Sequence, residues 1–590
     1  MKRNIPHCAW FVMLALILFL VLFSQTQATP PADQADTILT NGKFITVDAR
    51  DAIAETVAVR DGKILAVGTK DAVMRHAAPS THIIDLHGLT ATPGLIDAHL
   101  HFAAVDPIYS VDLSHARRIA EVLRAVRDRV AKSKPGEWIQ GYGWDEGKLA
   151  EHRYIYASDL DAVAPRNPVW LTHTTGHYGV ANTAAMKLAH LSAETNNPEA
   201  GTIDRDAHNQ PTGVLKEDAA MQLITSLIPP YSREQMREGY LKLMADLNKE
   251  GMTAIKDPGI TDEDWSIYRE LREQNKFTIR LFALWLGGSK LEQTRQVLAR
   301  ILALPKPRSA QADDLLISGG VKFFMDGSGG ARTAWMYADW NKDSTGTDSG
   351  NRGYPTTDPE VYRQQVRLLH NAGIHVGTHA VGDHAIDWVV DTYAQVLKEK
   401  PSTGLRHSII HANIPTDHAI ATMAALEKQF DAGYPEAQAE FMWWIGDTYT
   451  ANFGPARSLR LMPFHTYLTR GIPWAGGSDY PVTPFPGRYG IWSTVARKTL
   501  NGTYGYQPFG AAEAVDIHAA LRSYTIWAAH QLFLEDRIGS LEVGKAADIA
   551  VWDRDLYAIP PDELKNLKCE WTLFNGKTVY RDPASPITSQ

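Results

Sequence analysis

Apolar and polar positions alternate in a similar way at the two ends of the chain. Residues 37–68 alternate short β-rich runs with Asn-Gly and Asp-Gly turns, the dipeptides most typical of tight hairpins. Residues 538–555 and 570–580 repeat this pattern. We therefore expect one small β-sandwich domain formed from both chain ends, with its strands within 36–90 and 536–585.

The middle of the chain alternates apolar, strand-like runs with amphipathic helical stretches such as 358–373. Repeated βα units predict a parallel sheet, and the candidate polar residues follow the strand-like runs, where a (β/α)8 barrel builds its active site. We therefore expect an α/β fold with a (β/α)8 TIM-like barrel over 91–535; a doubly wound open sheet is the alternative. The strand-like runs are 251–257, 278–286, 319–327, 373–383, 406–413 and 471–481.

The segment 104–250 is too long for a single βα unit. We expect it to contain an insertion over the barrel mouth that carries Trp144 and His177. Aromatic residues in this segment and in 441–467 suggest an apolar or aromatic portion of the substrate. Packing beneath loops explains them equally well.

The first 28 residues have the pattern of an export signal. Lys2 and Arg3 precede an apolar run over 9–23, and Ala28 stands at a plausible cleavage point. The run is shorter than the roughly 20 residues that a membrane span needs. We expect a cleaved signal peptide and a periplasmic or secreted protein without stable membrane association; an uncleaved N-terminal anchor is the alternative. Cleavage would leave Cys569 as the single cysteine and exclude an intrachain disulfide.

The composition of the chain indicates which classes of partner to expect, but it says little about the fold. The 590 residues are 44% hydrophobic and 21% charged, with a net charge of −8, and no basic cluster stands out. We therefore expect a small-molecule partner and no nucleic acid. A homodimer is left open.

The run "TPGLIDAHLHF" (92–102) ends in two histidines, His99 and His101. Residues two apart lie on one face of a strand, so both imidazoles project together if 94–102 is extended. Two neutral imidazoles on one face suit a divalent metal. A pair of hydrogen-bonded core histidines is the alternative for this stretch alone.

Four further side chains lie in or directly after strand-like runs: Lys322, His379, His411 and Asp479. A buried lysine is costly unless it is neutralised or paired. Lys322 therefore either forms an ion pair, for example with Asp326, or carries carbon dioxide as a carbamate that can bridge two metals. Taken singly, each histidine could be a core residue and Asp479 a turn former. Together with the histidine pair, these positions predict a metal centre.

With these positions the chain resembles the amidohydrolase superfamily of metal-dependent hydrolases, and within it the amidohydrolase-3 group of YtcJ-like and N-substituted formamide deformylase-like proteins. The resemblance extends from about residue 36 to 580. It is carried, in order, by "TPGLIDAHLHF", "GYGWDEGKL", "DAVAPRNPVWLTHTTGHYGVANTAAM", "PTGVLKEDA", "VKFFMDGSGGARTA", "THAVGD", "IIHAN", "GSDYPV" and "IGSLEVGKAADIAVWD".

The resemblance implies one or two divalent metal ions, commonly zinc. One ion would be held by His99, His101 and Asp479. A carbamylated Lys322 would bridge to a second ion, whose further ligands would be His379 and His411.

The resemblance also implies catalytic roles for two residues. Asp479 would accept the proton of the attacking water, and His177 would polarise the substrate carbonyl. We expect the substrate to contact His177, Trp144 and Asp326.

Two positions depart from the family pattern. Ile410 precedes His411 where relatives often carry a glutamate, which keeps the ligand but removes a carboxylate. Lys256 stands where relatives more often show another polar residue, and it is a rival for the modified lysine.

The expected activity is hydrolysis of a non-peptide carbon–nitrogen bond, in a small amide or cyclic amide, by metal-bound hydroxide. Deamination at the same metal site is an alternative, although an export signal disfavours nucleobase salvage. A metal-stabilised binding or regulatory protein without catalysis is a further alternative.

Overall fold

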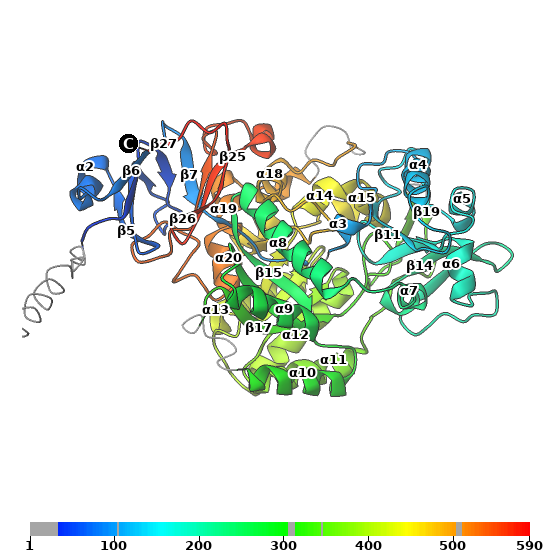
Figure 1. Ribbon diagram of the computed structural model, residues 1–590. Coiled ribbons are helices and arrows are strands. Elements are labelled where there is room, and N and C mark those ends of the chain that lie inside the picture. The colour runs from blue at the N-terminus through cyan, green and yellow to red at the C-terminus, as the bar shows by residue number, and fades with distance from the viewer. Residues whose placement is uncertain (1–32, 103–104, 305–312, 344–345, 503–509, 590) are drawn as a thin grey trace, which may run out of the picture.

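The computed structural model describes residues 33–102, 105–304, 313–343, 346–502 and 510–589. A β-rich domain lies at one end of the molecule, a barrel in the centre and an inserted α/β unit at the other end (Figure 1). Both ends of the described chain lie in the β-rich domain. No helix within the described residues is long and apolar enough to cross a membrane. The predicted signal segment, residues 1–28, lies outside the described residues.

The barrel is an eight-stranded parallel sheet, as predicted, in the order β23-β22-β21-β20-β17-β16-β15-β8. Its two edge strands approach each other, because the Ala98 amide beside β8 donates to the Gly476 carbonyl of β23 at 2.9 Å. The strands are β8 (Leu95–Asp97), β15 (Met252–Ile260), β16 (Arg280–Leu286), β17 (Leu316–Phe324), β20 (His375–Ala380), β21 (Ser408–His411), β22 (Tyr434–Ala437) and β23 (Ala475–Gly476).

Apolar side chains from the barrel strands pack together nearer the amino ends of the strands than the site residues do. Ile96, Phe282, Ile317 and Ala475 are buried in one cluster, against Leu532 that follows helix α20 (Ile526–Gln531). This cluster fills one end of the barrel and leaves the carboxyl ends of the strands to polar residues.

Helices connect successive barrel strands and cover the sheet. In α11 (Pro359–Asn371), the Asp358 carboxylate accepts from the amides of Glu360 and Val361. The helix ends before Gly373, whose φ of 70° suits the stop that the sequence predicts. The other crossover helices are α8 (Arg233–Lys249), α9 (Asp262–Glu273), α10 (Leu291–Ala303), α12 (Asp383–Glu399) and α13 (Asp417–Phe430).

The β-rich domain consists of two sheets made from both chain ends. One has the order β27-β6-β1-β4-β5 and the other β26-β25-β24-β7-β2-β3. Buried residues of both sheets, including Phe44, Val57 and Leu573, share one core. The strands are β1 (Thr37–Thr40), β2 (Lys43–Ile45), β3 (Ile53–Ala54), β4 (Thr56–Arg60), β5 (Lys63–Gly68), β6 (His82–Asp85), β7 (Thr90–Pro93), β24 (Ile549–Trp552), β25 (Cys569–Phe574), β26 (Lys577–Arg581) and β27 (Thr588–Ser589).

The predicted Asn-Gly and Asp-Gly turns connect their strands in different ways. Asp61-Gly62 and Asn575-Gly576 close two-residue hairpins, with positive φ at all four residues. Asn41-Gly42 instead joins β1 and β2, which belong to different sheets, so it carries the chain from one layer to the other. The backbone differs as well, because only Asn41 of this pair has a positive φ.

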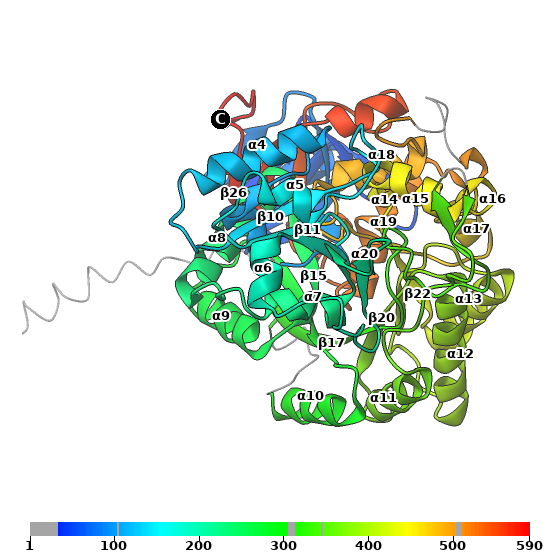
Figure 2. The same cartoon turned by 90° about the vertical axis from the view of Figure 1, so that its right-hand side faces the viewer.

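The inserted unit lies in front of the barrel when the right-hand side of Figure 1 faces the viewer (Figure 2). Its six-stranded sheet has the order β13-β14-β12-β11-β10-β9 and packs on its own buried core, so it covers about 111–225 of the expected 104–250. The elements are β9 (Val111–Asp112), α4 (Ile119–Val130), β10 (Ile139–Trp144), α5 (Ala157–Asp161), β11 (Val169–His173), β12 (Tyr178–Ala181), α6 (Thr183–Leu188), β13 (Thr202–Arg205), β14 (Pro211–Lys216) and α7 (Asp218–Thr225).

Candidate metal centre

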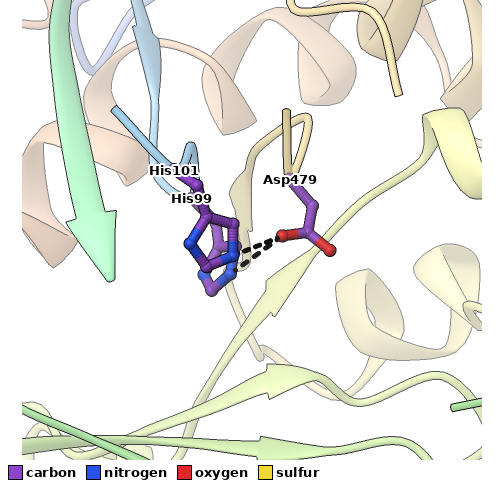
Figure 3. Close-up of side chains that lie close together, drawn as sticks. All are labelled: His99, His101 and Asp479. Atoms are coloured by element: carbon purple, nitrogen blue, oxygen red, sulfur yellow. Dashed lines mark ion pairs between the residues drawn. The ribbon is translucent and has the colours of Figure 1, made fainter. Parts of the chain in front are cut away.

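His99, His101 and Asp479 converge at the barrel mouth (Figure 3). Asp479 Oδ1 lies 3.3 Å from His99 Nε2 and 3.1 Å from His101 Nε2. One ligand atom from each residue lies within 4.8 Å of the others, a spacing at which a single ion can contact all three. The expected extended segment 94–102 is wrong in part: β8 ends at Asp97, and a bend rather than a strand presents the two imidazoles.

Several buried polar atoms of this centre have no hydrogen-bond partner among the described residues. They are His99 Nδ1 and Nε2, Asp479 Oδ1, Glu436 Oε2 and Lys322 Nζ. Buried polar atoms are normally satisfied, because an unmade hydrogen bond costs free energy. A cluster of unsatisfied imidazole, carboxylate and amine atoms therefore fits a divalent cation that uses them as ligands.

His411 and His379 each have one ring nitrogen committed to the protein. His411 Nδ1 donates to Gln438 Oε1 at 2.6 Å, which leaves the Nε2 lone pair free. His379 Nε2 donates to the Gly327 carbonyl at 3.0 Å, which leaves the Nδ1 lone pair free. The two ring centroids are 4.5 Å apart. Fixing the tautomer through the second nitrogen is the usual way to orient a metal-binding histidine.

Lys322 and Lys256 are both buried on barrel strands, but only Lys256 is paired. Lys256 Nζ lies 2.6 Å from Glu436 Oε1, and Ser408 donates to the same oxygen. The alternative ion pair of Lys322 with Asp326 is not formed, and burial lowers the pKa of Lys322 to about 8. Lys322 is therefore the better candidate for a nucleophilic, neutral amine.

The residues beneath the centre hold it together, and sequence reasoning missed them. The Asp97 carboxylate accepts from the amides of His99 and Ser478, and so ties the loop after β8 to the loop after β23. Glu436 and Gln438 come from β22 and the position just after it. A pair of polar residues two apart after Gly433 was the available signal, but Pro435 between them argues against a strand.

Three residues of the centre and its surroundings adopt left-handed backbone conformations. The φ angles are 73° at His411, 57° at Asp479 and 63° at Glu217. Such angles are unfavourable for residues with a side chain, and they concentrate at functional sites where the surrounding structure enforces them.

His177 reaches the centre from the inserted unit. Its ring centroid lies 5.1 Å from that of His379, and its Nδ1 donates to Glu217 Oε2 at 2.9 Å. Thr333 donates to the other oxygen of Glu217. Burial disfavours the charged imidazole, but Glu217 outweighs that effect and raises the pKa of His177 above its ordinary value.

A narrow cavity joins the histidine of the inserted unit to the barrel residues. It combines polar groups with apolar and aromatic walls, as small-molecule sites usually do. Its lining consists of Thr175, His177, Ser328, His379, Val381, His411, Phe441, Tyr449, Asp479 and Val482.

Two predicted substrate contacts, Trp144 and Asp326, do not line this cavity as the described residues form it. Trp144 is fully buried in the core of the inserted unit, where its Nε1 donates to the Leu171 carbonyl at 2.9 Å. Asp326 is fully buried as well, and its carboxylate accepts from the amides of Val381, Gly382 and Trp335. Asp326 therefore shapes the loop after β20.

A second group of possible ligands, Asp145, Glu146 and His173, lies in the inserted unit. Its charges offset one another, because Lys148 Nζ lies 3.8 Å from Asp145 Oδ2 and His173 Nε2 lies 3.2 Å from Glu146 Oε2. We interpret this group as an internal charge network.

The fold and the centre define a class: a barrel hydrolase whose strand ends gather imidazoles and a carboxylate around a divalent metal. Residues 82–580 match the amidohydrolase family, so the chain belongs to that family of metal-dependent hydrolases.

Two curated relatives extend over most of this chain. It is 31% identical over 565 residues to N-substituted formamide deformylase of Arthrobacter pascens, covering 93% of this chain and 99% of the relative. It is 28% identical over 530 residues to the putative amidohydrolase YtcJ of Bacillus subtilis, covering 89% and 96%.

A solved structure supports the fold. The chain is similar to the crystal structure of an uncharacterized metal-dependent hydrolase from Pyrococcus horikoshii, with a TM-score of 0.68 and 23% identity over 89% of this chain and 99% of that one.

Proposed function

We propose that this protein hydrolyses a non-peptide carbon–nitrogen bond in a small amide or cyclic amide, with zinc as the divalent ion. The observation that carries the proposal is that His177 faces the same cavity as Asp479 and the histidine cluster. Amide hydrolysis needs assistance at the carbonyl oxygen and at the leaving nitrogen. This cavity offers a different side chain for each.

The residues that would hold the ions are His99, His101, Asp479, His379 and His411, with Lys322 between the two groups. When bound, a divalent ion ionises water near neutral pH and polarises a carbonyl oxygen. Asp479 would take the proton of the attacking water and return it to the leaving nitrogen. His177, held by Glu217, would donate to the carbonyl oxygen.

The proposal includes a carbamate on Lys322. The neutral amine attacks the carbon of CO2, one proton leaves, and the product is an anionic group with two oxygens. Such a group would replace an amine that has no hydrogen-bond partner among the described residues by two ligand oxygens. Lys256 is a weaker candidate because its amine already pairs with Glu436.

The apolar part of the cavity supports a substrate with an apolar substituent. Phe441, Tyr449 and Val482 line it beside Asp479. The relative from Arthrobacter pascens is named for N-substituted formamides. We propose that the substrate class here is N-substituted amides with an apolar group on the nitrogen.

A screen of an amide library with the zinc-loaded protein, read by mass spectrometry, tests the activity. We expect release of an amine and an acid. Asp479→Asn should abolish turnover at unchanged circular dichroism, and Asp128→Asn, an exposed carboxylate on α4, should behave as wild type. Release of ammonia would instead indicate the alternative, deamination. Metal uptake without turnover of any library member would favour the binding protein.

A further inference from the structure

A second cavity lies at the opposite end of the barrel from the metal centre. Its volume is about 400 Å³, within the range of sites that bind small molecules. It is bounded by Glu427 of α13, by Tyr434 and Trp474 near the amino ends of β22 and β23, and by α20. The metal ligands lie at the carboxyl ends of their strands, so this cavity does not belong to the site described above.

The walls of the cavity are largely aromatic. The rings of Trp474 and Trp527 meet edge to face with centroids 5.0 Å apart, and Tyr434 forms another wall. The faces of such rings attract cations and stack on other rings. This lining suits a ligand with an aromatic ring, a positive charge or both.

One buried polar atom in the lining lacks a partner. Gln531 is 2% exposed, and its Oε1 has no hydrogen-bond partner within the described part of the chain. A buried amide oxygen without a hydrogen bond costs free energy, and a ligand N–H group would remove that cost. The lining therefore calls for a hydrogen-bond donor.

The charges of the lining do not balance. Glu535 forms an ion pair with Arg406 at 3.0 Å, and Lys545 forms one with Glu542 at 2.9 Å. Glu427 and Asp536 have no ion pair among the residues that the structure describes. Burial and the neighbouring Asp431 carboxylate raise the pKa of Glu427, although the charge of His530 opposes them. The three lining carboxylates, those of Glu427, Glu535 and Asp536, outnumber the two lining cations, Lys545 and the protonated form of His530, so the lining retains negative charge.

We propose that this cavity binds a small organic ammonium ion that carries an aromatic ring. The ring packs on Trp527 and Trp474, and the ammonium group donates to Gln531 Oε1 and faces Glu427. An inorganic cation would leave the aromatic walls without a contact, and an anion would meet the uncompensated carboxylates.

The test is calorimetric titration of the full-length protein with three probes of one shape. Phenethylamine is protonated at pH 7, 2-phenylethanol is neutral, and 3-phenylpropionate is negative. We expect phenethylamine to bind about tenfold or more tightly than the other two, because charge and donor are both required. Equal affinity for all three probes, or no binding of phenethylamine, overturns the proposal.

Variants locate the bound probe. Glu427→Gln should weaken phenethylamine binding about tenfold, while the matched change at an exposed residue, Glu199→Gln, should have no effect. Circular dichroism shows whether each variant is folded. Asp479→Asn should leave the affinity unchanged. If binding instead is lost in Asp479→Asn and retained in Glu427→Gln, the probe occupies the barrel mouth and the proposal is wrong. This outcome leaves the proposed hydrolase activity untouched, since that activity is measured by product release.

Discussion

Glu217 is predicted to control the catalytic contribution of His177 without touching the substrate. Its side chain is 5% exposed, and its carboxylate receives the His177 Nδ1 proton at 2.9 Å. Glu217→Gln keeps the shape and an acceptor oxygen but removes the charge. A buried, charge-assisted hydrogen bond contributes about 1.5–3 kcal/mol, roughly twice a neutral one. A loss of about 2 kcal/mol from the transition state corresponds to about a 30-fold fall in kcat.

The assay is steady-state hydrolysis of the substrate found in the amide screen, together with metal content. We expect kcat to fall about 30-fold with KM changed less than about threefold, because His177 acts on charge that develops in the transition state. Metal content should be unchanged. Thr333→Val is the control, since Thr333 contacts the other oxygen of Glu217 but not His177. An unchanged kcat in Glu217→Gln would refute the role of the pair. An equal effect of both variants would show that the Glu217 loop, and not the charge on His177, matters.

Four further predictions follow from the structure. Lys322→Ala should lower the metal content measured by plasma mass spectrometry, and short carboxylic acids should restore activity in part; retention of two metals without rescue would exclude the carbamate. Burial lowers the pKa of His370, which lies in a buried hydrogen-bonded pair with His407, so the unfolded chain binds more protons than the folded one. This contribution to stability is complete above the unfolded pKa of about 6.5 and is lost as the pH falls below it, so His370→Asn should flatten the dependence of urea unfolding on pH between about 7.5 and 5. Gly477→Ala would place a methyl group 2.6 Å from the His99 amide and 2.8 Å from Asp97 Oδ1, and should cost about 1–3 kcal/mol in urea unfolding and weaken metal binding. Intact mass of the protein from its native host should show loss of about the first 28 residues; retention of the full chain would favour the membrane anchor.

The sequence could predict that the candidate ligands converge because of a topological rule. The carboxyl ends of parallel strands meet at one mouth, so side chains such as Lys322 and Asp479, which are distant in the sequence, are brought to one region. The sequence did not show which local backbone conformation orients each side chain. His99 and His101 share a direction because of a bend after β8, not because of strand alternation.

The residues whose contacts sequence reasoning did not anticipate share a different property. Trp144 has the composition of a binding residue, but nothing in a single sequence tells a core tryptophan from one at a cavity wall. Glu436 lies on β22, a four-residue strand that contains Pro435, and neither strand length nor composition marked it. Glu217 was within a quoted motif, yet its role depends on a contact with His177, 40 positions earlier.

The metal centre and the group that would face the substrate belong to two separately packed cores. The ligands rest on the barrel, whereas His177 and Glu217 rest on the inserted unit. Their alignment therefore depends on contacts between the two parts, such as the Thr174 hydroxyl that donates to the Val482 carbonyl at 2.9 Å. Because a displacement of about 1 Å can reduce a rate about 100-fold, substitutions at this junction should reduce turnover without releasing the metal. Changes in the inserted unit can alter substrate choice while the ligand set stays intact, which is consistent with a family whose members act on different compounds around one kind of centre.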